Sequence, residues 1–357
     1  MTITKATPID QDKLNQFLGR FVDDLGAVFS APLVVIGDQL GLYRGLSDGG
    51  PQTSSELAAR TGCAERYVRE WLANQAAGGY VSYDPAGERF FLSPEQAFCL
   101  ADPASPAYLP GGVQLALSTT NDREKVAARF RTGDAMGWHE HHHDLFEGTE
   151  RFLRPGYAGN LVPSWLPALD GVVAKLTAGA RVADVGCGLG ASTLIMAAAF
   201  PASSFVGFDY HEASIEGARE RAAEAGLAER VTFEIDGAQD YPGSGYDLVT
   251  FFDCLHDMGD PVDAARHVRQ SLAPDGTWMV VEPYAGATLA ENLNPVGRVF
   301  YGASTTICTP AGLTDDGLAL GNQVPDATWE NLLRGAGWSS FRRVATTPFN
   351  RVFELRP

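Results

Sequence analysis

The chain has 357 residues, of which 45% are hydrophobic and 20% are charged, a composition typical of globular proteins. This length supports two hydrophobic cores, and no segment reaches the roughly 20 consecutive apolar residues that cross a bilayer. The formal net charge of −17 opposes binding to nucleic acids and to anionic membranes. Five cysteines without paired spacings indicate free thiols in a reducing compartment, so we expect a cytoplasmic protein.

Residues 11–46 carry apolar side chains at intervals of three and four residues, which predicts a helix with one broad apolar face. This face contains Leu14, Phe17, Leu18, Phe21, Val22, Leu25, Val28 and Phe29. Such a face needs a partner, either in its own domain or in a second subunit. We therefore expect a homodimer formed through the N-terminal domain.

The next segment is typical of a winged helix. A capping-box pattern predicts a short helix at 54–60, and a second helix is expected at 64–77. The second helix is expected to bury Tyr67, Val68, Trp71 and Leu72. Segments 80–83 and 89–92 flank a turn and predict a β-hairpin, which completes a mainly α winged-helix domain at 1–110.

A winged helix can bind DNA by placing its second helix in the major groove. Here that helix has no net charge, and residues 1–110 hold 8 Lys and Arg against 13 Asp and Glu. Because phosphate contacts supply most of the affinity for DNA, this balance makes nucleic acid an unfavourable partner. It favours dimerisation and closure over an active site as the role of the domain.

Residues 111–169 are expected to form a helical linker and a lid. The run 138–144 contains four histidines and two acids in seven residues, which raises the question of a metal site. Ligands at adjacent positions converge poorly on one ion, so we expect no metal here and polar contacts to cofactor or substrate instead. His139 is the predicted substrate contact.

From residue 170 onward, strand and helix patterns alternate, which predicts an α/β domain at 170–357. Five strands with intervening helices are followed by an antiparallel hairpin, giving seven strands. The strands are expected at 181–185, 205–208, 231–235, 246–251, 277–282, 341–345 and 349–355.

The most informative segment is 181–190, where a short apolar strand runs into three glycines. Glycine lets the backbone approach a ligand, and the next helix offers it free N–H groups. Twenty-five residues after Asp184, a second strand ends at Asp209, a carboxylate placed to accept both hydroxyls of a ribose. The acid beside the loop, and the lack of Lys and Arg in 182–210, favour a cofactor with a cationic head over a pyrophosphate. The cofactor residues expected here are Asp184, Gly186, Cys187, Gly188 and Gly190.

This pattern resembles the first motif of class I S-adenosylmethionine-dependent methyltransferases, and the likeness extends over residues 170–357. The resemblance implies a Rossmann-like, seven-stranded core with S-adenosyl-L-methionine as cofactor. It also implies cofactor contacts after the following strands, with Tyr210 near the adenine and Asp236 accepting from the adenine amino group. The contacts so implied are Asp209, Tyr210, Asp236, Gly237, Ala238, Phe252 and Asp253. The alternative interpretation of the segment 181–190 is a tight strand–helix turn, either in an NAD enzyme or in an α/β domain without a ligand.

The stretch 255–258 resembles the segment of small-molecule O-methyltransferases in which a histidine takes the substrate proton. The resemblance implies that His256 is the base and that Asp257 beside it belongs to the catalytic residues. The alternative is a histidine that caps a helix or lines the cofactor wall.

Residues 282–323 are longer than a connection needs to be, and such an insertion is where a substrate pocket is expected. Asn294, Arg298 and Tyr301 are the substrate candidates, although a salt bridge from Arg298 to a nearby glutamate is an equal expectation.

The winged helix and the segment 138–157 also resemble a group of actinobacterial methyltransferases. We therefore expect an S-adenosylmethionine-dependent methyltransferase that acts on a small molecule, with a hydroxyl group of an aromatic or polyketide-like metabolite as acceptor. Three alternatives remain: an amine acceptor, an S-adenosylmethionine-sensing transcriptional regulator without catalysis, and a cofactor-binding subunit that stabilises a partner enzyme.

Overall fold

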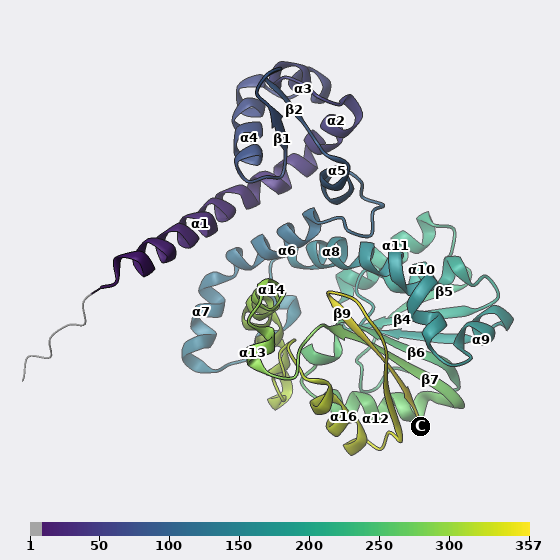
Figure 1. Cartoon of the computed structure of the whole chain (residues 1–357). Helices are drawn as coiled ribbons and strands as arrows, with labels where there is room; N and C mark the ends of the chain where they lie inside the picture. The colour runs from purple at the N-terminus through teal and green to yellow at the C-terminus, as the bar shows by residue number, and fades with distance from the viewer. Residues whose placement is uncertain (1–8) are drawn as a thin grey trace, which may run out of the picture. The chain divides into compact units, whose positions relative to one another are not determined.

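The structure, a computed structural model, describes residues 9–357 and divides into two compact units, Met1–Leu117 and Ser118–Pro357 (Figure 1). The expected boundaries at residues 110 and 169 differ from this division. Residues 118–169 of the segment expected to be a separate linker and lid belong to the same unit as the large sheet, and its helix α8 (Asp144–Asn160) contacts α10 (Ala191–Ala199).

The first unit contains five helices and one small hairpin before α6, which spans the division between the units. The elements are α1 (Gln11–Gln39), α2 (Leu42–Gly49), α3 (Ser54–Thr61), α4 (Glu65–Ala77), β1 (Ser82–Asp84), β2 (Arg89–Phe91), α5 (Pro94–Leu100) and α6 (Pro110–Asn121). The capping box at the start of α3 is formed as predicted. The helix expected at 11–46 is broken after α1, where Gly41 adopts φ = 67° and the chain turns into α2.

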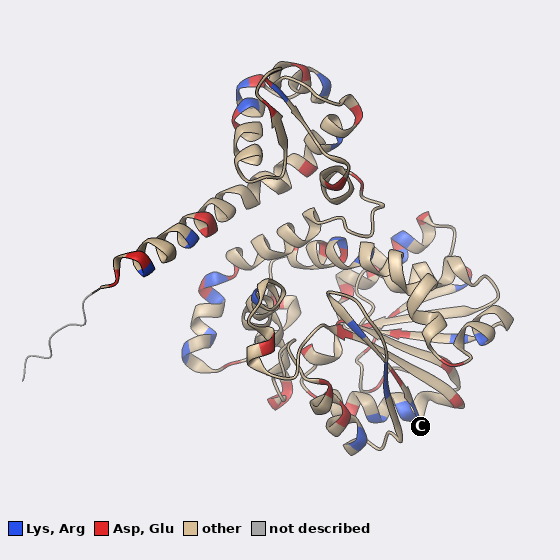
Figure 2. Ribbon diagram, in the orientation of Figure 1, with Lys and Arg blue, Asp and Glu red and all other residues tan. Residues whose placement is uncertain are grey.

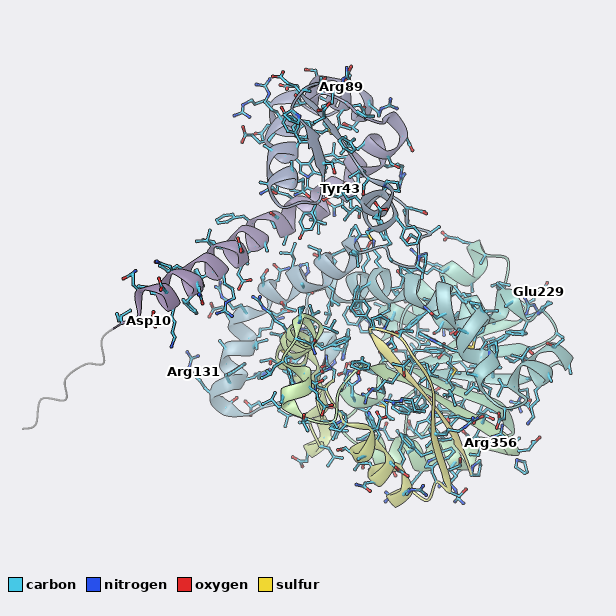
Figure 3. All side chains as sticks on the ribbon, viewed as in Figure 1. Asp10, Tyr43, Arg89, Arg131, Glu229 and Arg356 are labelled. Atoms are coloured by element: carbon cyan, nitrogen blue, oxygen red, sulfur yellow. The ribbon has the colours of Figure 1, made fainter. Side chains whose placement is uncertain are left out.

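The core of the first unit is built around Tyr43, which is labelled in Figure 3. Its hydroxyl bonds to Gln75 of α4 at 2.5 Å, and the indole N–H of Trp71 donates to the Leu33 carbonyl of α1 at 2.8 Å. These two bonds join three helices around a shared apolar cluster. The expectation that Tyr67 is buried was wrong: its side chain is 82% exposed, because it lies on the outer face of α4.

Most of the apolar face predicted for α1 has no partner among the described residues. Phe17, Phe21 and Phe29 are exposed, Phe29 to 69%, whereas α1 packs against α2 and α4 through its C-terminal part. A free apolar surface of this kind is typical of an interaction site.

No single helix in residues 9–357 is long and apolar enough to cross a membrane. One pair, α1 with α2, reaches the required length and composition together, and its two helices are bent by 66° relative to each other.

The second unit is a seven-stranded sheet in the order β5-β4-β3-β6-β7-β9-β8, which confirms the predicted fold. The first five strands in this order run parallel, and β9 is antiparallel to both of its neighbours. The strands are β3 (Arg181–Val185), β4 (Ser204–Asp209), β5 (Val231–Ile235), β6 (Tyr246–Phe252), β7 (Leu272–Pro283), β8 (Ser340–Thr346) and β9 (Asn350–Arg356).

Helices cover both faces of this sheet (Figure 1). One face packs against α9 (Val172–Ala178), α10 (Ala191–Ala199) and α11 (Glu212–Glu224), and the other against α12 (Pro261–Ser271) and α16 (Asp326–Gly335). Near-continuous apolar strands are expected when both faces of a parallel sheet are buried. The remaining helical segments are α7 (Arg123–Thr132), η1 (Trp138–Glu140), α8 (Asp144–Asn160), η2 (Leu161–Trp165), η3 (Leu166–Ala168), η4 (Leu255–Asp257), α13 (Leu289–Asn292), α14 (Pro295–Ala303), η5 (Ser304–Cys308), α15 (Thr309–Gly312) and η6 (Thr314–Asp316).

Candidate active site

A cavity of about 510 Å³ lies at the carboxyl ends of β3, β4, β5 and β6. In open α/β sheets this is the edge where ligands bind. Twelve of the residues predicted for the site line the cavity: His139, Gly186, Cys187, Gly188, Asp209, Tyr210, Asp236, Gly237, Ala238, Phe252, Asp253 and Asp257. The predicted residues outside the lining are Asp184, Gly190, His256, Asn294, Arg298 and Tyr301.

The glycine loop after β3 requires its glycines for two reasons. Gly186, Gly188 and Gly190 all have positive φ, at 71°, 52° and 78°. A Cβ on Gly186 would also lie 2.7 Å from the Cys254 sulfur, and one on Gly190 would lie 2.6 Å from the ring of Phe233. Gly190 is therefore a packing residue, while Gly186 and Gly188 bring backbone to the cavity wall.

Asp209 at the end of β4 holds this loop in place. Its carboxylate accepts the backbone N–H of Gly188 and that of His211, both at 2.9 Å. Burial raises the pKa of Asp209, and the two N–H bonds act in the opposite direction. Further lone pairs of this carboxylate remain for a ligand, because each oxygen accepts one of these two bonds.

Asp184 lies behind the loop and does not reach the cavity. Its carboxylate accepts hydrogen bonds from the hydroxyls of Ser192 and Thr193 at 2.6 Å and of Thr250 at 2.9 Å. These bonds tie β3 to the first turn of α10 and to β6. The geometry thus gives Asp184 a positioning role where the motif implied direct contact with the cofactor.

Helix α8 and the turn η1 supply a wall of the cavity. Phe146 stacks on His211 with ring centroids 4.1 Å apart, and His139 meets Tyr210 edge-on at 6.1 Å. The segments 147–150 and 154–157 are those expected to form a lid over the cofactor, and their residues Glu150, Arg154 and Tyr157 line the cavity. Trp138 and Phe146 also line it, although neither is among the predicted site residues.

Asp253 follows β6 with φ = 52° and faces the cavity. The Tyr157 hydroxyl donates to Oδ2 at 2.7 Å, and the Asn350 side-chain amide donates to Oδ1 at 2.8 Å. Burial raises the pKa of Asp253 to about 7, and the charge of Glu282 acts in the same direction. The two hydrogen bonds and the nearby His256 oppose this rise. Asp253 is therefore a carboxylate that changes its charge near neutral pH.

His256 lies beneath the cavity with its side chain only 3% exposed. Its Nδ1 is 2.8 Å from Glu282, and its Nε2 is 3.0 Å from Oδ1 of Asp257. Burial alone would lower the pKa of His256, but the two carboxylates raise it well above its usual value. Glu282 is an acid distant in the sequence, at the opposite nitrogen from Asp257, and the role of His256 as base stays a prediction.

Asp257 does reach the cavity, where its Oδ2 accepts the indole N–H of Trp138 at 3.0 Å. The substrate candidates of the insertion do not. Asn294 caps α14 by accepting the N–H of Gly297 at 2.9 Å, so its side chain is engaged locally, and Arg298 and Tyr301 follow it on the same helix.

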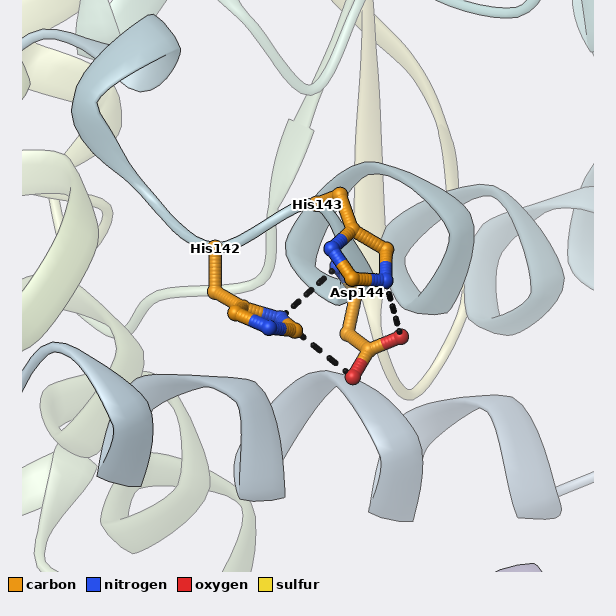
Figure 4. Close-up of side chains that lie close together, drawn as sticks. All are labelled: His142, His143 and Asp144. Atoms are coloured by element: carbon orange, nitrogen blue, oxygen red, sulfur yellow. Dashed lines mark hydrogen bonds and ion pairs between the residues drawn. The ribbon is translucent and has the colours of Figure 1, made fainter.

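The histidine run does not act as one group. His141 is buried and pairs with Asp122 at 3.1 Å. His142 and His143 instead bracket Asp144, at 3.3 and 3.5 Å, with their rings 4.1 Å apart (Figure 4). The run therefore divides: His142, His143 and Asp144 bring one ligand atom each within 4.8 Å of one another, whereas His139 is the histidine of the run that lines the cavity.

Comparison with known families agrees with this geometry. Residues 176–324 match the family described as "Methyltransferase domain", and residues 29–102 match the "Rv2258c-like winged HTH domain". The chain therefore carries a winged-helix domain followed by a methyltransferase domain. The two matches confirm that the chain contains the predicted winged-helix and methyltransferase domains. The predicted boundaries between them stay a prediction.

The methyltransferase domain has relatives of known activity. The chain is 33% identical over 131 residues to 27-O-demethylrifamycin SV methyltransferase of Amycolatopsis mediterranei, covering 34% of this chain and 48% of the relative. It is 32% identical over 108 residues to trans-aconitate 2-methyltransferase of Paracidovorax citrulli, covering 30% and 40%. The matched regions thus span less than half of the length of these curated relatives.

Solved structures share the fold across the whole chain. Mitomycin 7-O-methyltransferase superposes with a TM-score of 0.67 at 21% identity, covering 98% of this chain and 100% of that one. Human N-acetylserotonin methyltransferase in complex with S-adenosylmethionine gives 0.66 at 16% identity, covering 99% of each. An O-methyltransferase family protein of Burkholderia thailandensis gives 0.68 at 16% identity, covering 98% and 99%.

Proposed function

We propose that the protein uses S-adenosylmethionine to methylate a hydroxyl group of a small molecule. The observation that carries this proposal is the convergence of the glycine loop, Asp209 and the segment 236–238 on one cavity. We assign Asp209 to the ribose hydroxyls, Asp236 to the adenine amino group and Tyr210 to the adenine ring, and all three line the cavity. The match to the methyltransferase domain family supports the same cofactor.

The charge of the cavity also favours a cationic cofactor. Six acids line it, namely Glu150, Asp209, Asp236, Asp253, Asp257 and Asp315, together with one arginine, Arg154. That arginine is paired with Glu150 at 3.0 Å. A pyrophosphate would be repelled by such a lining, whereas a sulfonium and an ammonium group are attracted. NAD is therefore the weaker alternative.

Methyl transfer to a hydroxyl requires alignment with the sulfonium methyl, exclusion of water and removal of the hydroxyl proton. We assign the proton acceptor to Asp253. It faces the cavity, and a pKa of about 7 lets it accept a proton near neutral pH. Tyr157 and Asn350 fix the plane of its carboxylate.

Calorimetric titration with S-adenosylmethionine and S-adenosylhomocysteine tests the cofactor assignment. We expect micromolar binding that the Asp209→Ala variant loses. Binding would justify a screen of aromatic and polyketide-like hydroxyl compounds, with amines as the alternative acceptors, for a labelled methyl product. No heat with either ligand would overturn the proposal.

A DNA-binding regulator that senses S-adenosylmethionine is less well supported. On α4, Arg66 pairs with Glu70 at 2.6 Å and Arg69 with Glu65 at 2.8 Å, so neither arginine is left unpaired for phosphate. Figure 2 shows acidic and basic residues interleaved over this unit. A gel shift on sheared DNA at low salt should show no retardation, and clear retardation would favour the regulator.

The exposed apolar face of α1 supports the proposal of a homodimer formed through the N-terminal domain. All five cysteines are free and none is paired within residues 9–357, which supports a reducing, cytoplasmic location.

A further inference from the structure

The turn η1 carries Trp138 and His139 in the cavity wall, and side chains outside the cavity lining hold it in place. The first of these is Asp122, which directly precedes α7 and has a side chain only 4% exposed. Its Oδ2 lies 3.1 Å from Nδ1 of His141 and accepts the backbone N–H of His142 at 2.8 Å. One buried carboxylate thus binds the chain twice where it leaves η1.

Two cations of α7 hold the same turn. Lys125 lies 2.8 Å from Oδ1 of Asp122, and its ammonium also donates to the carbonyl of Glu140. Arg129, one helical turn further on, lies 3.1 Å from Oε2 of Glu140, whose Oε1 accepts the backbone N–H of Gly137 at 2.9 Å. We call Asp122, Lys125 and Arg129 the α7 clamp, because together they hold both ends of η1.

The ionisation of the clamp fixes which atom donates to which. Burial alone would raise the pKa of Asp122, but hydrogen bonds from Lys125 and from the His142 backbone lower it. Burial lowers the pKa of His141, although the hydrogen bond and the charge of Asp122 oppose this change. A neutral imidazole therefore donates its Nδ1–H to an ionised carboxylate, which can only accept. Nε2 of His141 is buried without a hydrogen-bond partner in residues 9–357, so Asp122 is the group that orients the ring.

On its other side, η1 contacts two residues of the cavity lining. Burial raises the pKa of Tyr210 to about 12, and hydrogen bonds from the backbone of His139 and Trp138 oppose this rise. The His139 ring also meets the Tyr210 ring edge-on at 6.1 Å, and the Trp138 indole donates to Oδ2 of Asp257 at 3.0 Å. The position of η1 therefore sets the position of Tyr210, the residue that we assign to the adenine ring.

We propose that Asp122 is a positioning residue for the S-adenosylmethionine of the proposed function, on which this role depends. Through the α7 clamp it holds η1 against Tyr210 and so fixes the adenine end of the cavity without touching the ligand. The glycine loop and Asp209 have hydrogen bonds of their own and stay in place when the clamp is lost. The competing interpretation is a buried polar cluster that stabilises the second unit and has no effect on the cofactor.

Calorimetric titration of the full-length protein with S-adenosylhomocysteine tests the proposal. Asp122→Asn removes the charge at constant size, and we expect it to weaken binding by about 3- to 30-fold, the usual effect of a residue that acts on a ligand without contacting it. Asp275→Asn is the matched control, because this exposed aspartate of the same unit also pairs with a lysine, Lys175, at 2.7 Å. Equal affinities of the two variants would overturn the proposal. If the unmodified protein binds no ligand, the proposed function and the role of Asp122 are both wrong, whereas binding that Asp122→Asn retains in full contradicts the role of Asp122 alone.

A double-mutant cycle separates positioning from a general loss of stability. Tyr210→Phe removes the hydroxyl to which the backbone of η1 bonds. Combined with Asp122→Asn, it should cost less affinity than the sum of the two single losses, because both changes break one path. Additive losses would overturn the proposal. His141→Asn, whose amide can donate in place of Nδ1–H, should retain more affinity than His141→Leu, and equal losses in these two variants would also overturn it.

Hydrogen exchange without any ligand shows whether the clamp acts on η1 alone. In Asp122→Asn, amides of residues 137–142 should exchange faster than in the unmodified protein, while those of β3 and β4 should be unchanged. Unchanged exchange at 137–142, or faster exchange throughout the sheet, would favour the purely structural cluster and overturn the proposal.

Discussion

The Tyr157 hydroxyl donates a 2.7 Å hydrogen bond to Oδ2 of Asp253, which connects α8 to the end of β6 across the cavity wall. Because this bond favours the ionised carboxylate, it moderates the pKa that burial has raised to about 7. Tyr157 thus tunes the group that we assign as proton acceptor.

Replacement of that acceptor should affect turnover more than binding. We expect Asp253→Asn to lower kcat by about 10²- to 10⁴-fold, the usual contribution of a general base, with the dissociation constant for S-adenosylhomocysteine little changed. Steady-state kinetics and calorimetry measure the two quantities. If the variant instead loses the ligand, Asp253 is a cofactor contact, as the sequence resemblance implied.

The pH dependence of the unmodified enzyme should follow the same carboxylate. The base must be ionised, so kcat/KM should rise with pH and level off above about pH 7, and activity should be lost as pH falls through that value. In Tyr157→Phe, which removes a hydrogen bond that lowers the pKa, the rising limb should move to higher pH. A profile identical in both proteins would contradict this role of Tyr157.

Asp209→Ala should weaken the binding of S-adenosylmethionine by roughly 2–4 kcal/mol, because a charged acceptor for two ribose hydroxyls is removed and the Gly188 N–H loses its partner. Isothermal titration calorimetry measures the change. Glu229→Ala is the control: this residue is exposed, lies outside the cavity lining and is labelled in Figure 3. Equal affinities of the two variants would contradict the assignment of the ribose site.

Asp184→Asn should act on stability. The amide can replace only part of an acceptor that serves three hydroxyls, so we expect a loss of about 2–3 kcal/mol in the free energy of unfolding. Denaturant unfolding measures this loss, and Thr250→Val, which removes one of the three donors, should lose less. If Asp184→Asn has unchanged stability but fails to bind the cofactor, the result would support the direct cofactor contact that the motif implied.

Double substitution of Phe21 and Phe29 by glutamate should convert a homodimer into a monomer, because charges on the exposed apolar face of α1 oppose its burial. Light scattering coupled to size-exclusion chromatography gives the mass. Gln16→Glu, an exposed polar position on the same helix, should leave the dimer intact. A monomer in the unmodified protein would remove the basis for this interface.

The elements that sequence predicts well are those set by local pattern. The seven strands follow from the alternating β and α patterns and the terminal hairpin, whereas their order in the sheet was not predicted. The glycine loop with Asp209 is recognisable because its residues lie within one βαβ unit. Burial could not be read in the same way. Tyr67 has the right periodicity but lies on the outer face of α4, and Asp184 has the right motif position but points to the hydroxyls of α10.

The parts that sequence could not supply depend on contacts between distant segments. Asp253 meets Asn350 across 97 positions, and His256 meets Glu282 across 26, so no local pattern pairs them. Cys308 came from an insertion that we expected to hold substrate residues. Its side chain instead approaches η4, which only the folded chain reveals.

Strand β9 lies between β7 and β8 and carries Asn350 at its start, opposite Pro283 of β7. The side-chain amide of Asn350 donates one of the two hydrogen bonds that lower the pKa of Asp253 and so oppose the effect of burial. Local opening at the start of β9 therefore removes a donor and raises the proton affinity of a group on the other side of β7. The acid–base chemistry of the cavity is in this way coupled to local opening of the β8–β9 hairpin at the antiparallel end of the sheet. A change that loosens this hairpin should therefore increase hydrogen exchange at β9 and also shift the rising limb of the pH profile.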